Sequence, residues 1–246
     1  MKKINHNFLI NQYKVTNNPK INHNYLRYQF NNIEPILKDI QKLVQRSDFT
    51  LGEEVNYIEN KFKKITNSKY AIGVGSGTDA IKLSLKSLGI KKGDEILTSP
   101  YTFYGTIGAI VALEAIPVFV DISDDYNIDV NKIESKITKK SKAILPVHWS
   151  GLICDMKKIK KIADKYNLFI VEDACHAILA SRDKKRAGFY SHAACYSMHP
   201  LKNLNVWGDG GIITTNSKKM HDNLVLERNH GLIDRNICKI FASNSR

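Results

Sequence analysis

The stretch YAIGVGSGTDAIKLSLKSLG, residues 70–89, joins two kinds of periodicity. It begins with a β-prone, largely apolar run and continues through a glycine-rich segment, 75–77. Apolar side chains then recur at helical spacing, at Ile81, Leu85 and Leu88. This pattern predicts a strand that is followed directly by a helix. Because free amides and the helix dipole attract anions, glycines at such a junction favour a phosphate site.

The same junction suits one phosphate better than a pyrophosphate. A dinucleotide-binding fingerprint would have a third glycine where Thr78 stands, and a P-loop would contain Gly-Lys-Ser/Thr, which is absent here. A glycine-rich turn without a ligand explains the motif equally well when it is considered alone.

Strand-like and helix-like runs alternate along most of the chain. The β-rich runs are 70–74, 95–98, 117–121, 142–147, 168–172, 193–197 and 211–215. The helical patterns cover 33–44, 53–64, 78–88, 104–114, 130–137, 155–166 and 217–228. This alternation predicts an α/β fold with a mainly parallel seven-stranded sheet and helices on both faces. Ligands of such sheets bind beyond the carboxyl ends of the strands.

Composition limits the class of protein. With 246 residues, 43% of them hydrophobic, the chain can bury a substantial core. Residues 1–31 are rich in Asn and weakly periodic, so we expect an N-terminal arm followed by one domain over 32–246. The net charge of +13 is compatible with nucleic acid, an acidic membrane or an anionic substrate. The lysines are dispersed, however, and biased codon usage explains this charge as well as a partner does.

The cysteines and the N-terminus indicate the compartment. Four cysteines occur without a CxxC pair, each in or beside an apolar run, and we expect free, buried thiols in a reducing compartment without disulfides. The N-terminus has no apolar core of a signal peptide, and no stretch is long enough to cross a bilayer. We therefore expect a cytoplasmic protein with no membrane partner.

A second candidate site follows the run LFIVEDACHAILA, residues 168–180. Its apolar start predicts a strand buried on both faces, which ends in Glu172 and Asp173. Taken alone, this acidic pair is better explained as a helix cap or a salt bridge. His176, taken alone, is better explained as a hydrogen-bonded core histidine than as a catalytic group.

A third candidate site lies in ACYSMHPLKNLNVWGDGG, residues 194–211. Lys202 stands there among apolar, aromatic and glycine residues, where burial would lower the pKa of an amine and make it a nucleophile toward carbonyls. Taken alone, it is better explained as an exposed loop lysine. Together, a phosphate site, an acid at a strand end and a sequestered lysine are the groups that bind pyridoxal 5'-phosphate.

The chain from Asp48 to Gly231 resembles the DegT/DnrJ/StrS-type sugar aminotransferases, a branch of the fold-type-I pyridoxal phosphate enzymes. Seven motifs carry the resemblance in register. They are GSGTDAI at 75–81, SPYTFYGTIGAI at 99–110, EAIPVFVDI at 114–122, PVHWSGLICDM at 146–156, VEDACHA at 171–177, YSMHPLKNLNVWGDGGIITT at 196–215 and RNHG at 228–231. The resemblance implies the large domain of an aspartate aminotransferase-like fold.

The resemblance also assigns roles to residues. It implies that Lys202 forms the Schiff base with the cofactor and that Asp173 pairs with the pyridine nitrogen. His176 would contact the ring hydroxyl, a position often occupied by Gln in relatives. The remaining expected cofactor contacts are the phosphate-binding Gly77, Thr78 and Ser197, the aromatic Phe103 stacked on the ring, and Asn229, which would reach the phosphate of a neighbouring subunit. Tyr101 and Tyr104 are close rivals of Phe103.

The implied activity is transfer of an amino group from glutamate to the keto sugar of a nucleotide diphosphate-sugar, as in polysaccharide biosynthesis. Lys202 would move the proton between the donor and the cofactor. The shared phosphate contact implies a homodimer with shared active sites. Family members extend considerably further, so we expect that a C-terminal small domain is largely missing from this sequence and that the fragment is inactive alone.

Three alternatives compete with this interpretation. A sugar dehydratase with the same cofactor would have histidine in place of the lysine, and His199 lies nearby, but the register places Lys202 at the critical position. A basic nucleic-acid-binding or regulatory protein would show a clustered basic face. A zinc site at His192, Cys195 and His199 is disfavoured because His192 would lie on the other face of its strand and no fourth ligand is evident. We therefore expect no metal and no nucleic-acid partner.

Overall fold

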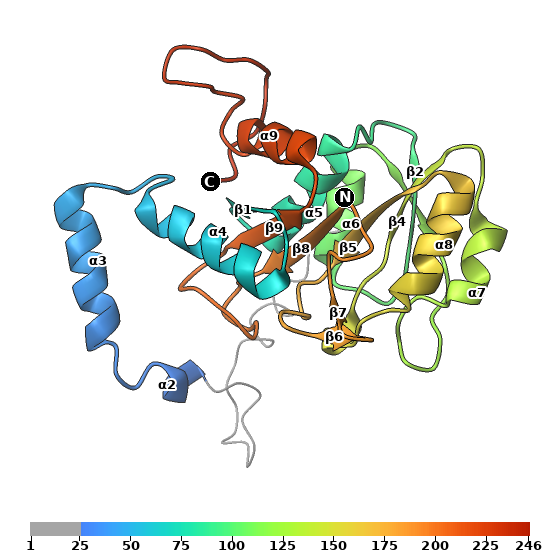
Figure 1. Cartoon of the computed structure of the whole chain (residues 1–246), viewed down its shortest axis with the longest axis horizontal. Helices are drawn as coiled ribbons and strands as arrows, with labels where there is room; N and C mark the ends of the chain where they lie inside the picture. Colours follow the sequence, from blue (N-terminus) through green and yellow to red (C-terminus); the bar gives the residue numbers. More distant parts are fainter. Residues whose placement is uncertain (1–25) are drawn as a thin grey trace, which may run out of the picture.

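The computed structural model describes residues 26–246, so most of the Asn-rich arm expected over residues 1–31 lies outside the described part (Figure 1). A seven-stranded sheet forms the centre of the molecule, in the order β1-β9-β8-β5-β4-β2-β3. Its strands are β1 Tyr70–Val74, β2 Glu95–Thr98, β3 Ile116–Phe119, β4 Ser141–Leu145, β5 Phe169–Asp173, β8 Ala193–Ser197 and β9 Gly211–Thr215.

The predicted mainly parallel sheet is confirmed. Strands β3, β2, β4, β5 and β8 run parallel, whereas β9 pairs antiparallel with both β8 and β1. Each of the seven predicted β-rich runs forms one of these strands, with shifts of one or two residues at some ends. The carboxyl ends of the parallel strands therefore meet at one edge of the sheet, where ligands of such sheets bind.

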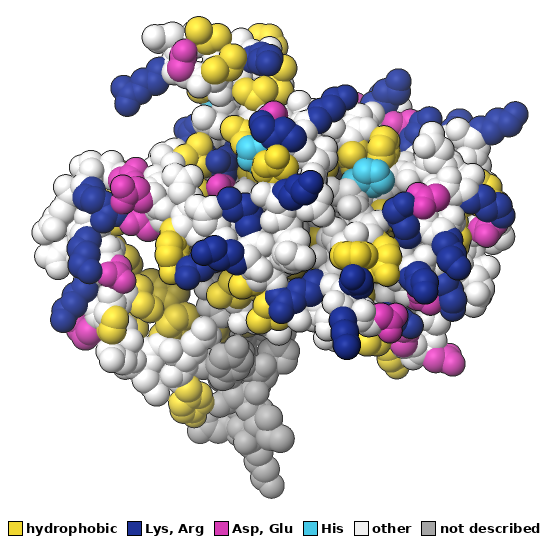
Figure 2. Space-filling model, in the orientation of Figure 1, with side chains coloured by type: hydrophobic (Ala, Val, Ile, Leu, Met, Phe, Trp, Pro, Cys, Tyr) yellow, Lys and Arg dark blue, Asp and Glu magenta, His cyan; other side chains and the backbone are white. Residues whose placement is uncertain are grey.

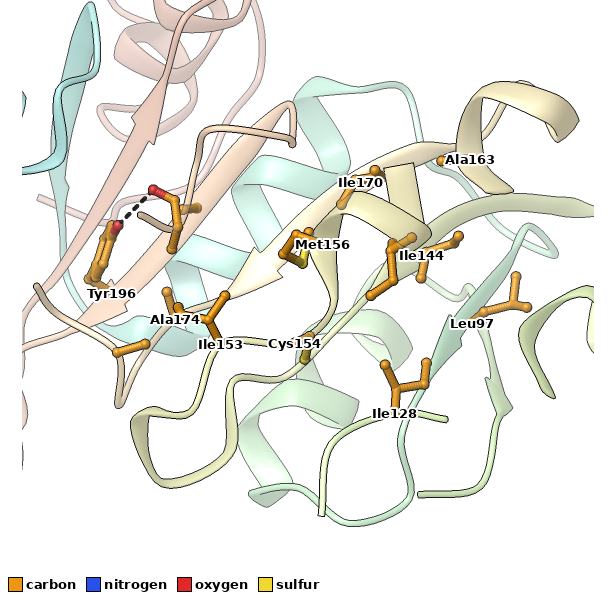
Figure 3. Close-up of a cluster of buried hydrophobic side chains, with 14 of the residues drawn as sticks. Leu97, Ile128, Ile144, Ile153, Cys154, Met156, Ala163, Ile170, Ala174 and Tyr196 are labelled. Atoms are coloured by element: carbon orange, nitrogen blue, oxygen red, sulfur yellow. Dashed lines mark hydrogen bonds between the residues drawn. The ribbon is translucent and has the colours of Figure 1, made fainter. Parts of the chain in front are cut away.

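Helices cover both faces of this sheet, as predicted. Those that pack on it are α4 Glu53–Thr66, α5 Gly77–Ser87, α6 Tyr104–Val111, α7 Val130–Ile133, α8 Met156–Tyr166 and α9 Lys218–Glu227. Buried side chains of α4, α7 and α8 belong to one core cluster, and those of α5, α6 and α9 belong to a second cluster on the opposite face. Figure 3 shows part of the first cluster, where Met156 and Ala163 of α8 lie near Ile144 and Ile170 of the sheet.

The strands separate these two clusters because successive side chains of a strand point to opposite faces. Ile170 of β5 joins the first cluster and Val171 joins the second. Ile212 and Ile213 of β9 divide in the same way. Both neighbours are apolar in each case, which explains why the central strands are continuous hydrophobic runs in the sequence.

A short hairpin was not predicted from the sequence. Strand β6 (Ser181–Arg182) pairs antiparallel with β7 (Lys185–Arg186). The two residues between them, Asp183 and Lys184, both have positive φ values, of 51° and 59°. A two-residue hairpin turn with two positive φ angles usually contains glycine, and its absence here left no recognisable signal.

Helix α3 (Glu34–Arg46) forms where the apolar spacing predicted it, but it has no buried residue. It lies away from the sheet, at the left of Figure 1. Five apolar side chains are 37–52% exposed here; they are Ile33, just before the helix, and Ile36, Leu37, Ile40 and Val44 within it. We refer to these five residues as the α3 stripe. The short helix α2 (Leu26–Gln29) precedes it, and Phe30 packs edge-on against Trp207, with ring centroids 5.6 Å apart.

The expectation of four buried cysteines is wrong at one position. Cys154 and Cys195 are buried and Cys175 is half-buried, but Cys238 is exposed. Cys238 lies in the projecting loop 232–241, whose apolar side chains Ile233, Ile237 and Phe241 are exposed as well (Figures 1 and 2). Apolar neighbours in the sequence therefore did not imply burial. All four thiols are free. No helix in the described residues combines the length and the hydropathy needed to span a membrane.

Gly211, the first residue of β9, allows a close contact between this strand and the segment before α5. A Cβ atom at Gly211 would overlap the backbone carbonyl of Ser76, which cannot move aside as a flexible side chain would. We therefore expect Gly211→Ala to lower the free energy of unfolding by about 1–3 kcal/mol. Urea denaturation followed by circular dichroism would measure the change.

Gly108→Ala is the matched control for this substitution. A Cβ at Gly108, within α6, would meet only the Tyr104 ring at an ordinary 3.7 Å. Alanine is the better helix former by up to about 1 kcal/mol, so this variant should be as stable as the wild type or slightly more so. Equal stabilities of the two variants would contradict the role assigned to Gly211.

Candidate active site

A cavity of about 350 Å³ opens at the carboxyl ends of the parallel strands. Seven of the eight residues that the sequence analysis selected for the cofactor site line it. They are Gly77, Thr78, Phe103, Asp173, His176, Ser197 and Lys202. These residues come from four separate segments of the chain, so the fold brings together the three candidate sites that were identified separately in the sequence.

The start of α5 forms one wall of this cavity. Ser76 is the N-cap, and its hydroxyl accepts a hydrogen bond from the Asp79 N–H at 3.0 Å. The amides of Gly77 and Thr78 belong to the first turn, which has no carbonyl of its own helix to accept them. A Cβ at Gly77 would lie 2.8 Å from both the Cys175 Sγ and the Ser197 Cβ. Glycine therefore permits the approach that places these amides beside Ser197.

Asp173, the last residue of β5, forms the floor of the cavity. It is only 6% exposed. Its Oδ2 accepts a hydrogen bond from the Thr106 hydroxyl at 2.7 Å, and its Oδ1 accepts from the Cys175 N–H at 3.2 Å. Within the described residues, the carboxylate is thus held by hydrogen-bond donors rather than by an ion pair. The helix-cap and salt-bridge interpretations of the acidic pair therefore do not describe Asp173, whereas Glu172 does pair with His148, at 2.6 Å.

Burial and nearby charges shift the pKa values of two residues of the cavity, His176 and Cys175. Burial lowers the pKa of His176, and the positive charge of Lys202 lowers it further, against the opposing effect of Asp173. His176 is therefore a neutral hydrogen-bonding group at physiological pH. Burial also raises the pKa of Cys175 well above its usual range, and the Asp173 carboxylate adds to this effect. Cys175 is thus a protonated thiol rather than a nucleophile.

Lys202 lies in a tight turn that follows β8. Its N–H donates to the His199 carbonyl at 2.8 Å, and its own carbonyl accepts from the Asn205 side chain at 3.2 Å. The imidazole of His199 is part of the same turn, because its Nδ1 accepts from the Leu201 N–H at 3.2 Å. Lys202 is half-buried and Trp207 is 52% exposed, so the lysine is less enclosed by this chain than its sequence neighbours suggested.

Only one of the three aromatic candidates around the start of α6 lines the cavity. Phe103 does so, while 68% of it remains exposed. Tyr101 instead stacks near Trp149 and Tyr126, with ring centroids 4.6 Å and 5.5 Å away. Tyr104 is 83% exposed. Phe103 is therefore the one of the three that borders the cavity, and its stacking on a cofactor ring stays a prediction.

Asn229 is the one predicted residue that does not line the cavity. It lies beyond α9, pairs with Asn244 through an isolated β-bridge, and its side-chain oxygen accepts from Arg246. Its predicted contact was with a neighbouring subunit, so its place in a single chain leaves that expectation a prediction.

Several residues of the cavity were not selected from the sequence. Thr106 holds Asp173, and Trp149 forms part of the wall, with its ring 5.7 Å from that of His176. Both belong to motifs that carried the family resemblance, but a threonine or a tryptophan has no spacing that distinguishes a site residue from a core residue. Only the tertiary contact with Asp173 identifies Thr106.

His148 also lines the cavity, but its ring nitrogens are already bonded to the protein. Nδ1 accepts from the Cys154 N–H at 3.3 Å, so Nε2 carries the proton and donates to Glu172 Oε2 at 2.6 Å. Glu172 is fully buried and also accepts from the Gly188 N–H at 2.8 Å. This pair joins the segment that follows β4 to β5 and leaves His148 without a free nitrogen for proton transfer.

The residues of the rejected zinc site point to separate partners. The Nδ1 of His192 accepts from the Ile170 N–H, and the Cys195 thiol lies 3.4 Å from the Ser84 hydroxyl. Within residues 26–246, no group of three or more His, Cys, Asp or Glu side chains is placed to hold a metal ion.

The electrostatic effect of Lys202 on the pKa of His176 can be tested without a ligand. Lys202→Met removes the positive charge that lowers the pKa of His176, so this pKa should rise, while burial keeps it from rising fully. An NMR titration of the histidine ring protons would measure it. Lys219→Met changes an exposed lysine of α9 and should leave the titration of His176 unaltered. If the pKa of His176 is the same in Lys202→Met as in the wild type, this arrangement of the cavity is refuted.

Known proteins resemble this chain in sequence and in fold. A relative from Geobacillus stearothermophilus named "pleiotropic regulatory protein" is 38% identical over 223 residues, which are 90% of this chain and 60% of that protein. The dTDP-3-amino-3,6-dideoxy-alpha-D-galactopyranose transaminase of Aneurinibacillus thermoaerophilus is 41% identical over 207 residues, which are 84% of this chain and 56% of that enzyme. The chain thus spans little more than half the length of these curated relatives.

Solved structures agree closely with the fold. DesV of S. venezuelae, in complex with a ketimine intermediate, superposes with a TM-score of 0.89 at 32% identity, over 93% of this chain and 62% of that one. NtdA of Bacillus subtilis, with bound cofactor PMP, gives a TM-score of 0.88 at 32% identity, over 96% of this chain and 55% of that one. The model of the DegT/DnrJ/EryC1/StrS aminotransferase family matches residues 31–246. The chain belongs to this family.

Proposed function

We propose that this chain is the cofactor-binding part of a pyridoxal phosphate-dependent aminotransferase. The enzyme would transfer an amino group from glutamate to the keto sugar of a nucleotide diphosphate-sugar. One observation carries the proposal: the amine of Lys202, the carboxylate of Asp173 and the first turn of α5 line the same cavity. These are the groups that an aldehyde, a pyridine nitrogen and a phosphate require.

The residues present fit this cofactor. The contact that Gly77 makes possible leaves the first-turn amides of α5 facing the cavity, where a phosphate dianion would accept from them. The side chains of Thr78 and Ser197 border the same place. The cavity volume of about 350 Å³ lies within the range of small-molecule sites.

Bound pyridoxal phosphate would supply an aldehyde that reacts with amines and a ring that withdraws electrons. Lys202 would bond to the aldehyde and, when released as a free amine, accept and return the proton of the amino donor's α-carbon. Asp173 would hold a proton on the ring nitrogen by its negative charge. The two donors already bound to this carboxylate fix its position on the cavity floor.

His176 and Phe103 would orient the ring between these groups. His176 is neutral because its pKa is lowered by burial and by Lys202, so it can hydrogen-bond to the ring hydroxyl without adding a charge. Relatives with Gln at this position would use an amide in the same way. Phe103, at the cavity wall and largely exposed, offers a flat apolar face on which the ring can pack.

The substrate class follows from the relatives. The enzyme of Aneurinibacillus thermoaerophilus is a dTDP-amino sugar transaminase, and a relative from Bacillus subtilis is named spore coat polysaccharide biosynthesis protein SpsC. A nucleotide diphosphate-sugar is anionic, and the net charge of +13 suits such a substrate. We place the enzyme in the cytoplasm, since three of its four free thiols are at least partly buried and suit a reducing compartment.

A homodimer with shared active sites would complete this arrangement. Asn229 lies outside its own chain's cavity, as expected of a residue that serves the neighbouring one. The α3 stripe and the apolar side chains of loop 232–241 remain exposed to solvent in the described part of the chain. Apolar surface of this kind marks an interface. Phe103, 68% exposed at the cavity wall, would also gain cover from a second subunit.

The competing functions have weaker support. A dehydratase would act through His199, but Nδ1 of His199 is engaged by the Leu201 N–H, whereas the Lys202 amine is available at the cavity. A regulatory function is suggested by the name of the Geobacillus relative. A nucleic-acid-binding protein would gather its basic side chains, and on the face in Figure 2 Lys and Arg are scattered among Asp and Glu.

Reconstitution with pyridoxal phosphate tests the proposed function. The purified chain should develop the visible absorption of a lysine-bound cofactor, and added glutamate should replace it with the absorption of the pyridoxamine form. Lys202→Ala should abolish the covalent adduct, because no other described lysine lines the cavity. Reduction with borohydride followed by peptide mass analysis would locate the modified lysine.

Lys219→Ala serves as the control, because this exposed lysine of α9 lies outside the cavity. It should bind the cofactor as the wild type does. A wild-type chain that binds no pyridoxal phosphate, or an adduct that persists in Lys202→Ala, would refute the assignment. Bound cofactor that does not respond to glutamate would refute the proposed amino donor.

The proposed dimer predicts a specific effect at the α3 stripe. Ile40→Glu would bury a charge in the interface, so the dissociation constant of the dimer should rise by tenfold or more. Analytical ultracentrifugation would measure it. Lys38→Glu reverses a charge at an exposed position of the same helix, outside the stripe, and should change the constant much less. Equal effects of the two substitutions would place the interface elsewhere.

A further inference from the structure

Two hydrogen-bond donors from distant segments hold the carboxylate of Asp173. The Thr106 hydroxyl donates to Oδ2 at 2.7 Å, and the Cys175 N–H donates to Oδ1 at 3.2 Å. Thr106 is 1% exposed and Asp173 is 6% exposed. Water therefore has little access to replace a lost donor. A carboxylate oxygen left without one would bear the full cost of its desolvation.

The hydroxyl of Thr102 forms a further hydrogen bond, with the Thr106 hydroxyl that contacts Asp173. The Oγ1 atoms of Thr102 and Thr106 lie 2.7 Å apart, a distance at which either could donate. The geometry resolves the choice, because a hydroxyl has one hydrogen and Thr106 uses its hydrogen on Asp173. Thr102 must therefore donate to Thr106. The hydrogen bonds run in one direction, from Thr102 through Thr106 to Asp173.

The turn that begins α6 supplies both threonines. The Thr106 N–H donates to the carbonyl of Phe103, the N-cap residue, at 3.1 Å. Gly105 packs so closely on α5 that a Cβ there would lie 2.6 Å from the Thr78 hydroxyl. The backbone carrying the two hydroxyls is thus held between α5 and the end of β5. Neither threonine was selected from the sequence.

We propose that Thr106 and Thr102 are positioning residues that hold the Asp173 carboxylate in one orientation before any ligand binds. The inference rests on the proposed function, in which Asp173 binds the ring nitrogen of the cofactor. A carboxylate whose orientation is already set loses less freedom on binding, and the affinity is higher for that reason. Thr102 contributes because a hydroxyl that accepts a hydrogen bond is itself a stronger donor.

Cofactor affinity is the first readout. In an absorbance titration with pyridoxal phosphate, Thr106→Val should raise the dissociation constant by about tenfold or more, since a donor to a charged group is lost. Thr102→Val, which leaves the contact with Asp173 in place, should raise it by a smaller factor. Thr106→Ser keeps the hydroxyl and should restore an affinity close to that of the wild type.

Thr98→Val is the matched control. Thr98 of β2 is fully buried, and its hydroxyl donates to the Leu145 carbonyl at 2.8 Å, so this variant also loses one buried hydrogen bond. Thr98 does not line the cavity. Thermal unfolding should show a loss of stability in both valine variants. Only Thr106→Val should also lose affinity, which a merely structural threonine would not explain.

A second readout needs no cofactor. The Cys175 N–H donates to Asp173 Oδ1, so its NMR chemical shift reports the orientation of the carboxylate. This signal should move in Thr106→Val and stay in place in Thr106→Ser and Thr98→Val. If Thr106→Val fails to fold, Thr102→Val carries the same test with a smaller displacement.

The two readouts separate failure of this inference from failure of the proposed function. Wild-type affinity together with an unmoved Cys175 signal in a folded Thr106→Val chain would overturn the positioning role. Equal losses of affinity in Thr106→Val and Thr98→Val would overturn it as well. A wild-type chain that binds no pyridoxal phosphate, with a Cys175 signal that still moves in Thr106→Val, would refute the proposed function and leave the positioning of Asp173 supported.

Discussion

The first turn of α5 lies closer to the end of β8 and to the residues after β5 than any side chain at position 77 would permit. A single Cβ atom there would stand 2.8 Å from the Sγ of Cys175 and the Cβ of Ser197. Gly211 plays the matching part from β9, where a side chain would overlap the Ser76 carbonyl. These contacts bring the free amides of a helix to residues that follow them by about a hundred positions in the chain. The cavity exists because of this approach.

The cavity combines groups whose charges shift the pKa values of their neighbours. Asp173 provides a negative charge held by two donors, and Lys202 provides a positive charge whose field reaches His176 and Cys175. Burial keeps His176 neutral and the Cys175 thiol protonated. His148 is hydrogen-bonded to the buried Glu172 and to the Cys154 N–H, so it has no free ring nitrogen for proton transfer. Lys202 is the residue to which the proposed function assigns proton transfer in this cavity.

Much of this architecture could be predicted from local pattern. The apolar runs of β5 and β9 are continuous because neighbouring side chains enter different core clusters. These continuous runs made both strands predictable from the sequence. Lys202, Asp173 and Gly77 could be selected because glycine junctions and strand ends are where such chemistry occurs. Local pattern failed where environment decides: the α3 stripe has helical spacing without a core beside it, and Cys238 has apolar neighbours in an exposed loop.

The sequence by itself determined the succession of strands and helices along the chain and the resemblance to a family. It also indicated which residues could bind a phosphate, a ring nitrogen and an aldehyde. Periodicity and backbone preferences are local properties, so they can be followed along the chain. Only the tertiary structure decided that Phe103 rather than Tyr101 borders the cavity, that Thr106 and Thr102 support Asp173, and that His148 is unavailable. Each of these depends on distances between segments remote in sequence, which packing of helices on the two faces of the sheet sets.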